Sequence, residues 1–167
     1  AGNDFQGAVT FSGGTVRLTD ANNLTIHIGT SAVNTHLTAA GSISETDYLS
    51  VGGWTFLTAG ADINLGLSNT LVGQVQFTAA NATIQNSAPT VLGDSTATGT
   101  ITLSLVDSLV AANLTATNLN ISGATTINQT NAWKVTGTTS IAGSGAVVVD
   151  NAANDFNSMY IAGTVIV

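Results

Sequence analysis

Short segments in which apolar and polar residues alternate run through this sequence from end to end. Examples are LTIHI at 24–28, TITLSL at 100–105 and NLNI at 118–121, and turn-forming clusters such as TDANN and TGTT separate them. Alternation with period two is typical of strands that bury one face, and clusters of small polar residues with Gly are typical of turns. The pattern predicts an all-β chain built from many short strands.

The type of polar residue supports the same fold class. The 167 residues include 27 Thr, 16 Asn and 14 Ser, whereas Lys and Arg together number 2. Thr favours strands through its branched β-carbon, Asn favours turns, and helices draw their solubility mainly from Lys, Glu, Arg and Gln. With 44% hydrophobic residues, the chain is long enough for one domain with a continuous core.

Similar segments recur along the chain and indicate a solenoid. Each begins with an apolar residue and ends in a small polar turn, at spacings of about 18 to 25 residues. They start near Leu24, Leu49, Leu71, Val91, Leu109 and Trp133. We predict a right-handed parallel β-helix of roughly seven coils, with the handedness expected from the steric preference of parallel crossovers. Outward Thr, Asn and Ser suit such a stack, because ladders of like charges would repel.

A longer repeat is carried by the tripeptide NDF. It occurs at residues 3–5 and again at residues 154–156, and a similar apolar pattern follows each copy. This repeat predicts that residues 1–167 form a single β-solenoid segment. One tandem unit of about 151 residues would span 3–153, and residues 154–167 would begin the next.

Charge and cysteine content exclude several classes of function. The net charge is −7, and two cationic side chains cannot neutralise a run of phosphates, so we expect no nucleic-acid partner. The absence of cysteine rules out thiolate zinc sites, iron–sulfur clusters and a cysteine nucleophile.

Three stretches resemble a known group of repeats. NDFQGAVTFSGGTVRLTDANNLTI at 3–26, LSVGGWTFLTAGADINL at 49–65 and AVVVDNAANDF at 146–156 are similar to passenger repeats of filamentous-haemagglutinin-type proteins. These are exoproteins of two-partner secretion and, more loosely, autotransporters of Gram-negative bacteria. The resemblance implies a secreted, cell-surface stalk or filament, delivered by an outer-membrane partner transporter and able to meet surface glycans. It weakens between Gln74 and Ser108, and it transfers no binding or catalytic residue to this chain.

The candidate catalytic and metal-binding residues are few. Glu45 and Asp47 are two positions apart, as the paired carboxylates of a polysaccharide-cleaving β-helix would be, but Arg17 and Lys134 are the only cations available to support them. We interpret the pair as a solvated turn. His27 and His36 lack the tight spacing of metal sites, and the calcium-binding GGxGxD pattern is absent. We therefore expect no catalytic, cofactor or metal site and no enzymatic activity.

The remaining polar and aromatic candidates have structural interpretations. Six aspartates next to turn residues are expected to cap backbone groups: Asp20, Asp62, Asp94, Asp107, Asp150 and Asp155. Five Asn-x-Ser/Thr triplets are about the number that this composition gives by chance. The aromatics most able to contact a sugar or a partner are Trp54, Phe56, Trp133 and Tyr160. Trp54 and Phe56 share one strand face, which we expect to lie in the core.

These observations favour a structural repeat of a large secreted bacterial surface protein, either an adhesin stalk or an extracellular filament. Open strand edges would let copies associate end to end, and the weakly charged flanks could pack laterally. Two alternatives stay open. One is a surface-binding or ice-binding threonine array, because Thr-x-Thr pairs occur between Thr96 and Thr138, although not at one coil period. The other is a β-sandwich adhesin repeat.

Overall fold

The computed structural model describes residues 3–166 and contains 19 strands in that range, with no helix. The strands are β1 Val9–Gly13, β2 Val16–Asp20, β3 Leu24–Ser31, β4 Thr35–Ala39, β5 Ile43–Glu45, β6 Leu49–Val51, β7 Thr55–Ala59, β8 Ile63–Leu71, β9 Gln74–Ala79, β10 Ala82–Asn86, β11 Thr90–Leu92, β12 Ser95–Ala97, β13 Thr100–Leu105, β14 Leu109–Ala111, β15 Leu114–Ala116, β16 Asn118–Ser122, β17 Ile127–Gln129, β18 Trp133–Val148 and β19 Asp155–Ile166.

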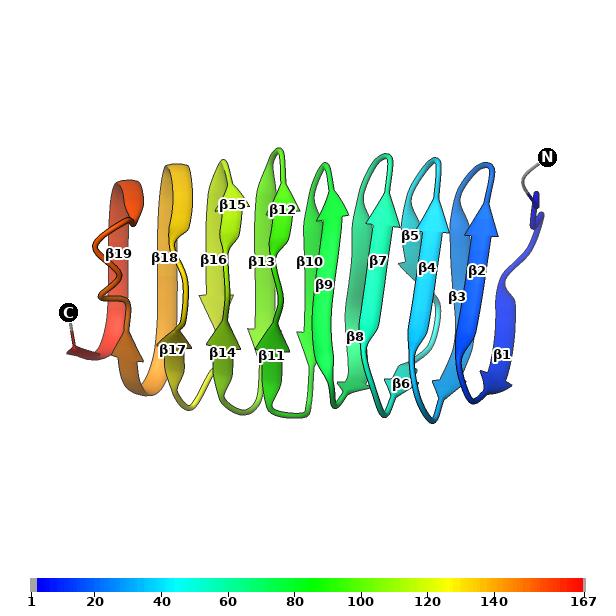
Figure 1. Ribbon diagram of the computed structural model, residues 1–167, viewed down its shortest axis with the longest axis horizontal. Helices are drawn as coiled ribbons and strands as arrows, with labels where there is room; N and C mark the ends of the chain where they lie inside the picture. The colour runs from blue at the N-terminus through cyan, green and yellow to red at the C-terminus, as the bar shows by residue number, and fades with distance from the viewer. Residues whose placement is uncertain (1–2, 167) are drawn as a thin grey trace.

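All strand pairs are parallel, and each strand pairs with strands of the neighbouring windings. Paired residues lie between 17 positions apart, as in Gln74 with Val91, and 21 positions apart, as in Lys134 with Asp155. The chain makes about eight turns along one axis, with its two ends at opposite ends of the stack (Figure 1). The predicted all-β parallel solenoid is confirmed, and a β-sandwich of antiparallel strands is ruled out. The right-handed sense of winding stays a prediction.

The strands form three stacks that run the length of the solenoid. The first stack contains β2, β4, β7, β9, β12, β15 and the beginnings of β18 and β19. The second contains the first half of β3, then β5, the first half of β8, β10, β13, β16 and the middle of β18. The third contains β1, the second half of β3, β6, the end of β8, β11, β14 and β17. Three strand segments per winding enclose a single core.

The core consists of apolar columns in which each inward side chain lies above its equivalent in the previous winding. In the first stack, Leu37 and Leu57 pair directly and are each 1% exposed, and Phe77 continues the column. Burial of one such side chain contributes about 1.5–3 kcal/mol relative to leaving it exposed. Because each winding covers the next, the windings stabilise one another.

Side-chain amides and carboxylates close the corners between stacks. At the corner after the first stack, Asn23 Oδ1 accepts the backbone N–H of Ser42 at 2.8 Å, and Asp62 Oδ1 accepts the backbone N–H of Asn81 at 3.1 Å. At the opposite corner, Asn69 is fully buried and its Oδ1 accepts the backbone N–H of Leu49 at 2.7 Å. These bonds satisfy corner groups that the strand ladders leave unpaired.

One winding is shorter than its neighbours. Between β8 and β10 the register shifts, because Ala82 pairs with Ile63 but Asn86 pairs with Asn69. The start of β9 then pairs with β11 while its end pairs with β12. This irregular winding lies within the region, Gln74 to Ser108, where the sequence resemblance weakens.

Both ends of the stack leave apolar residues only partly covered. Leu18 and Phe11 at the β1–β2 end, and Phe156 and Ile161 in β19, are partly buried against the core. At one end, Asn3 forms an isolated parallel bridge with Asp20, which begins an inward column of the first stack. At the other end, Phe156 pairs with Val135 and so belongs to the same column. The first residue of one NDF segment and the third residue of the other therefore occupy the same column, so the two segments are offset by two positions within the winding. The 151-residue unit stays a prediction.

Candidate functional site

Two outward columns on the first stack carry the most regular and the most aromatic surfaces of the molecule. The first, here named the threonine ladder, places one exposed Thr on each of six consecutive windings. Its members are Thr19, Thr38, Thr58, Thr78, Thr96 and Thr115. Neighbouring windings of a parallel sheet lie about 4.8 Å apart, so the ladder is a straight row of hydroxyl and methyl groups.

The second column lies two residues earlier on the same strands and begins with a cation. Arg17 on β2 pairs with His36 on β4, His36 pairs with Phe56 on β7, and Phe56 pairs with Gln76 on β9. Trp54 precedes β7 on the same face. These five residues are here named the aromatic strip.

The rings of the aromatic strip pack on one another. His36 and Phe56 are stacked, with ring centroids 4.6 Å apart and an angle of 16° between planes. Trp54 meets Phe56 edge to face at 5.7 Å and 65°. Trp54 is still 53% exposed, so about half of the indole faces solvent. Partial burial and, secondarily, the positive charge of Arg17 lower the pKa of His36 below its usual value, so the ring is uncharged at neutral pH.

The expectation that Trp54 and Phe56 lie in the core is wrong, although they do share a face. Leu57 and Ala59 continue the inward columns of Leu37 and Ala39, so the residues at even positions of this strand must point outward. A shift of one residue would have turned Leu57 to solvent. Of the four aromatics singled out in the sequence, Trp133 is the fully buried one, and its Nε1 donates to the carbonyl of Ala112 at 2.9 Å. Tyr160 is 67% exposed.

The two carboxylates in SISETDYLS have different hydrogen-bond partners. Glu45 Oε1 accepts the backbone N–H of Leu67 at 2.6 Å and Asn69 Nδ2 at 3.0 Å, whereas Asp47 caps the backbone N–H of Tyr48 at 2.9 Å. Burial raises the pKa of Glu45, and these two hydrogen bonds oppose the rise. The prediction of a solvated turn therefore holds for Asp47 and is wrong for Glu45, which is half-buried because the next winding covers it.

The histidines lie apart from each other. His27 Nδ1 is 3.2 Å from Thr46 Oγ1 on the second stack, while His36 belongs to the aromatic strip. Within residues 3–166, no group of three or more His, Asp or Glu side chains is placed to hold a metal ion.

The predicted capping role is confirmed for four of the six aspartates. Asp20 and Asp107 accept backbone N–H groups within their own turns, from Asn22 and Ser108. Asp62 and Asp94 accept from asparagines of the next winding, Asn81 and Asn113. For Asp150 and Asp155 the capping role stays a prediction.

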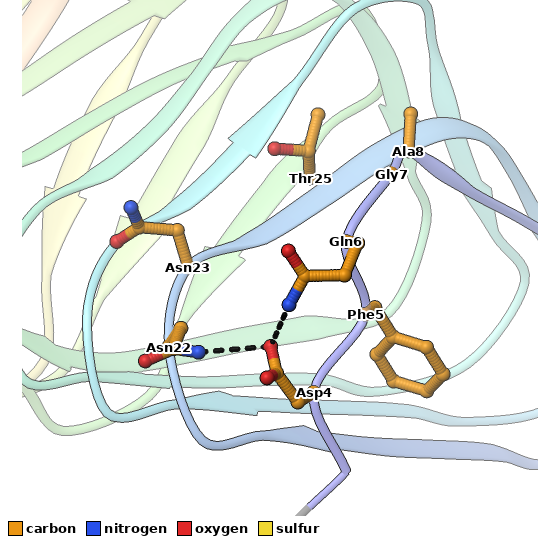
Figure 2. Close-up of a pocket in the computed structure, with 8 residues that line it drawn as sticks. All are labelled: Asp4, Phe5, Gln6, Gly7, Ala8, Asn22, Asn23 and Thr25. Atoms are coloured by element: carbon orange, nitrogen blue, oxygen red, sulfur yellow. Dashed lines mark hydrogen bonds between the residues drawn. The ribbon is translucent and has the colours of Figure 1, made fainter.

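A depression of about 380 Å³ opens at the N-terminal end of the stack. It forms where the segment 4–8 runs beside β3 before the pairing of β1 begins (Figure 2). Asp4 Oδ1 accepts hydrogen bonds from Gln6 at 2.6 Å and from Asn22 at 2.8 Å. The Asp4 carboxylate is therefore already hydrogen-bonded to side-chain amides at the end of the stack. We interpret the depression as part of the structure of that end.

Sequence reasoning missed the threonine ladder, although the chain carries a signal for it. The dipeptide Thr-Ala recurs at 38–39, 58–59, 78–79, 96–97 and 115–116. Each copy places Thr outward and Ala inward on the first stack. Counting Thr-x-Thr pairs along the chain could not find this pattern, because the ladder runs across the windings.

Comparison with protein families places the chain. A family model described as "Repeats of unknown function (DUF5649)" matches residues 13–78 and again residues 102–162, together about three quarters of the chain. The chain belongs to this DUF5649 repeat family. The gap between the two DUF5649 matches, 79–101, includes most of the irregular winding. Each match spans several windings, so tandem repetition is part of this chain.

Comparisons with curated proteins and with solved structures gave no match. The resemblance to filamentous-haemagglutinin-type repeats therefore stays a hypothesis. In the part of the chain that the structure describes, no helix is long and apolar enough to cross a membrane.

Proposed function

We propose that this chain is a structural repeat that supplies length and stiffness to a large secreted bacterial surface protein, such as an adhesin stalk or filament. The observation that carries the proposal is the continuous parallel ladder from β1 to β19, in which interior strands are bonded to windings on both sides. A rod of this kind resists bending, because bending would stretch backbone hydrogen bonds along one side.

The ends of the rod support extension by further windings. Met159 on β19 is the last member of an inward column of the second stack, above Thr139, and it is 37% exposed. Leu119, an interior member of the same column next to Thr139, is fully buried. A further winding, from flanking sequence or from a second copy, would cover Met159 and complete the open ladder.

The setting of the rod follows from the resemblance in sequence. We propose a cell-surface location, export by an outer-membrane partner transporter, and contact with host or neighbouring-cell glycans, with no enzymatic role. The surface is compatible with this setting, because its polarity comes from Thr, Asn and Ser and its net charge is −7.

Deletion of one winding tests the structural role. Thr38 pairs with Thr58, so removal of residues 39–58 joins equivalent positions and should give a folded rod about 4.8 Å shorter by small-angle scattering. The matched control removes residues 39–48, about half a winding, and should unfold because the strands no longer stack in phase. If the full-winding deletion unfolds as readily as the control, the proposal fails.

Self-association is tested by two neighbouring residues of β19. Met159→Asp places a charge on the open inward column, and Tyr160→Asp places it on the outward face. Sedimentation velocity should show concentration-dependent end-to-end association in the native chain and in Tyr160→Asp, with loss of association in Met159→Asp. Equal behaviour of the two variants would contradict association through the ends.

The threonine ladder favours a second candidate function, binding to an ordered surface such as ice. Six exposed, regularly spaced Thr on one flat stack form such an array, and β-branching restricts their rotamers. Thr58→Tyr and Thr78→Tyr should then abolish thermal hysteresis of the native chain. Native protein without any hysteresis would rule this function out.

A further inference from the structure

The aromatic strip differs from the rest of the outward surface in its chemistry. Most outward positions carry Thr, Asn, Ser or Gly, but here an indole, a phenyl ring, an imidazole and a guanidinium lie on adjacent windings. The chain has only one other Lys or Arg, which is Lys134. It lies in the column of the threonine ladder, between Thr115 and Asp155. Clustered exposed aromatics with an arginine are typical of binding surfaces.

We propose that the aromatic strip binds an acidic glycan, a chain of sugar rings that carry carboxylates. The exposed half of the Trp54 indole offers a flat apolar surface for the C–H face of a sugar ring. Arg17 offers a guanidinium that can bind a carboxylate with two hydrogen bonds. Arg17 is exposed on β2, so its guanidinium is accessible to a ligand.

The polar neighbours fit the hydroxyl groups of a glycan. Gln76 continues the strip beyond Phe56, and the threonine ladder runs parallel to it, two residues away on the same strands. From Arg17 to Gln76 the strip spans four windings, or about 14 Å, which is the length of a few sugar rings. Amide and hydroxyl groups can both donate and accept hydrogen bonds, as sugar hydroxyls do.

The backbone argues against a peptide as the ligand. The strands β4 and β7 are bonded to windings on both sides, so they offer no free edge to which an extended peptide could add. Recognition at this face has to come from side chains. The net charge of −7 repels a polyanion at long range, so the attraction has to come locally from Arg17.

The inference rests on the proposed surface role for the source of the glycan, but its test does not depend on the deletion experiment. An oligomer of galacturonic acid and its methyl ester have the same rings and linkages and differ in charge. Titration of the full chain, followed by isothermal titration calorimetry, should show binding of the acid and weaker binding of the ester. An acidic peptide of similar length serves as the third probe.

Four variants locate the site. Trp54→Ala and Arg17→Gln should each weaken binding of the acid about tenfold, and Arg17→Gln should also remove the preference over the ester. Tyr160→Ala and Lys134→Gln, an exposed aromatic and a cation outside the strip, should leave binding unchanged. All four positions are exposed, and equal urea midpoints would show that the variants fold.

Four results would overturn the proposal: no binding of the acid, equal binding of the ester, tighter binding of the peptide, or equal losses in the strip variants and their controls. A rod that passes the winding-deletion test but binds no uronate keeps the structural function and loses the glycan site. A chain that fails the deletion test but binds through Trp54 keeps the site and loses the rod.

Discussion

The two segments that match the repeat family each contain one tryptophan, and the two residues have opposite environments. Trp54, in the segment 13–78, is 53% exposed at a corner of the winding, whereas Trp133, in the segment 102–162, is fully buried. Trp133 lies above Leu114 in an inward column, while Trp54 precedes a strand whose inward positions are held by Thr55 and Leu57. The same type of residue therefore serves the core in one segment and the surface in the other.

The outward columns of the two segments differ in the same sense. The first segment carries the cation and rings of the aromatic strip. In the second segment, Thr117 and Thr136 are exposed on neighbouring windings, two positions after Thr115 and Lys134. Their inward columns are alike, since both are filled by Leu, Ile, Val and Ala. The repeat thus constrains what the winding buries and leaves the outward positions free to differ, so a binding function is expected on the outside.

The largest predicted effect separates the two tryptophans. Trp133→Ala removes a fully buried ring and its hydrogen bond to Ala112, and should lower the free energy of unfolding by about 3–5 kcal/mol. Trp54→Ala removes a half-exposed ring, and should change it by no more than about 0.5 kcal/mol. Urea unfolding followed by far-UV circular dichroism measures both. Similar losses would show that the aromatic strip is a second core.

The buried corner of the first segment gives the next effect. Asn69→Ala leaves the backbone N–H of Leu49 without its acceptor and removes a donor to Glu45. The expected loss of unfolding free energy is about 2–3 kcal/mol, because unpaired buried polar groups keep their desolvation cost. Asn64→Ala, on the exposed outward face, is the control and should be nearly neutral. Chemical denaturation of both variants provides the comparison, and equal values would mean that this amide does not hold the corner.

A corner of the second segment depends on backbone conformation. Gly123 has φ +77°, and a Cβ there would lie 2.1 Å from the carbonyl oxygen of Leu105 in the previous winding. Among the described residues of the first segment, no residue has a positive φ. Gly123→Ala should therefore cost about 1–3 kcal/mol.

The control for this corner is Gly14→Ala, because a Cβ at Gly14 meets no atom within 4 Å. Thermal unfolding should show a lower midpoint for Gly123→Ala than for Gly14→Ala. Equal midpoints would show that the winding at Gly123 can move away from a Cβ without loss of stability, so the positive φ of Gly123 would not contribute to the stability of this corner.

The smallest effect depends on pH and belongs to the first segment. Because burial raises the pKa of Glu45 above its ordinary value of 4.5, the folded chain holds this proton more tightly than the unfolded chain. The resulting stabilisation is complete below pH 4.5 and is lost as the pH rises through the higher pKa of the folded state. Glu45→Gln does not titrate, so native chain and variant should differ in the slope of unfolding free energy against pH. Parallel slopes from pH 4 to 7 would contradict the raised pKa.

Several features could be predicted because their causes are local. Alternation in LTIHI and TITLSL identified strands, and aspartates beside turn residues, such as Asp20 and Asp107, identified backbone caps. The preference of Thr and Asn for strands and turns acts within a few residues, so it can be read without the rest of the chain.

The candidate site could not be predicted, because it depends on register between windings. Whether Trp54 and Phe56 point inward is decided by Leu57 and Ala59, which continue the columns of Leu37 and Ala39 from the previous winding. The burial of Glu45 likewise depends on Leu67 and Asn69 from the following winding. The recurrent Thr-Ala dipeptide indicates which residues of the first stack point outward, but only after the windings have been aligned.

The amino-acid sequence by itself determined that this chain is all-β, because short alternating segments rich in Thr and almost free of Lys, Arg and Glu favour strands over helices. The recurrence of these segments predicted the parallel winding. Only the tertiary structure decided which side chains share an outward column. The physical reason is that winding length varies between 17 and 21 residues, so small differences at the corners determine whether Arg17, His36 and Phe56 become neighbours.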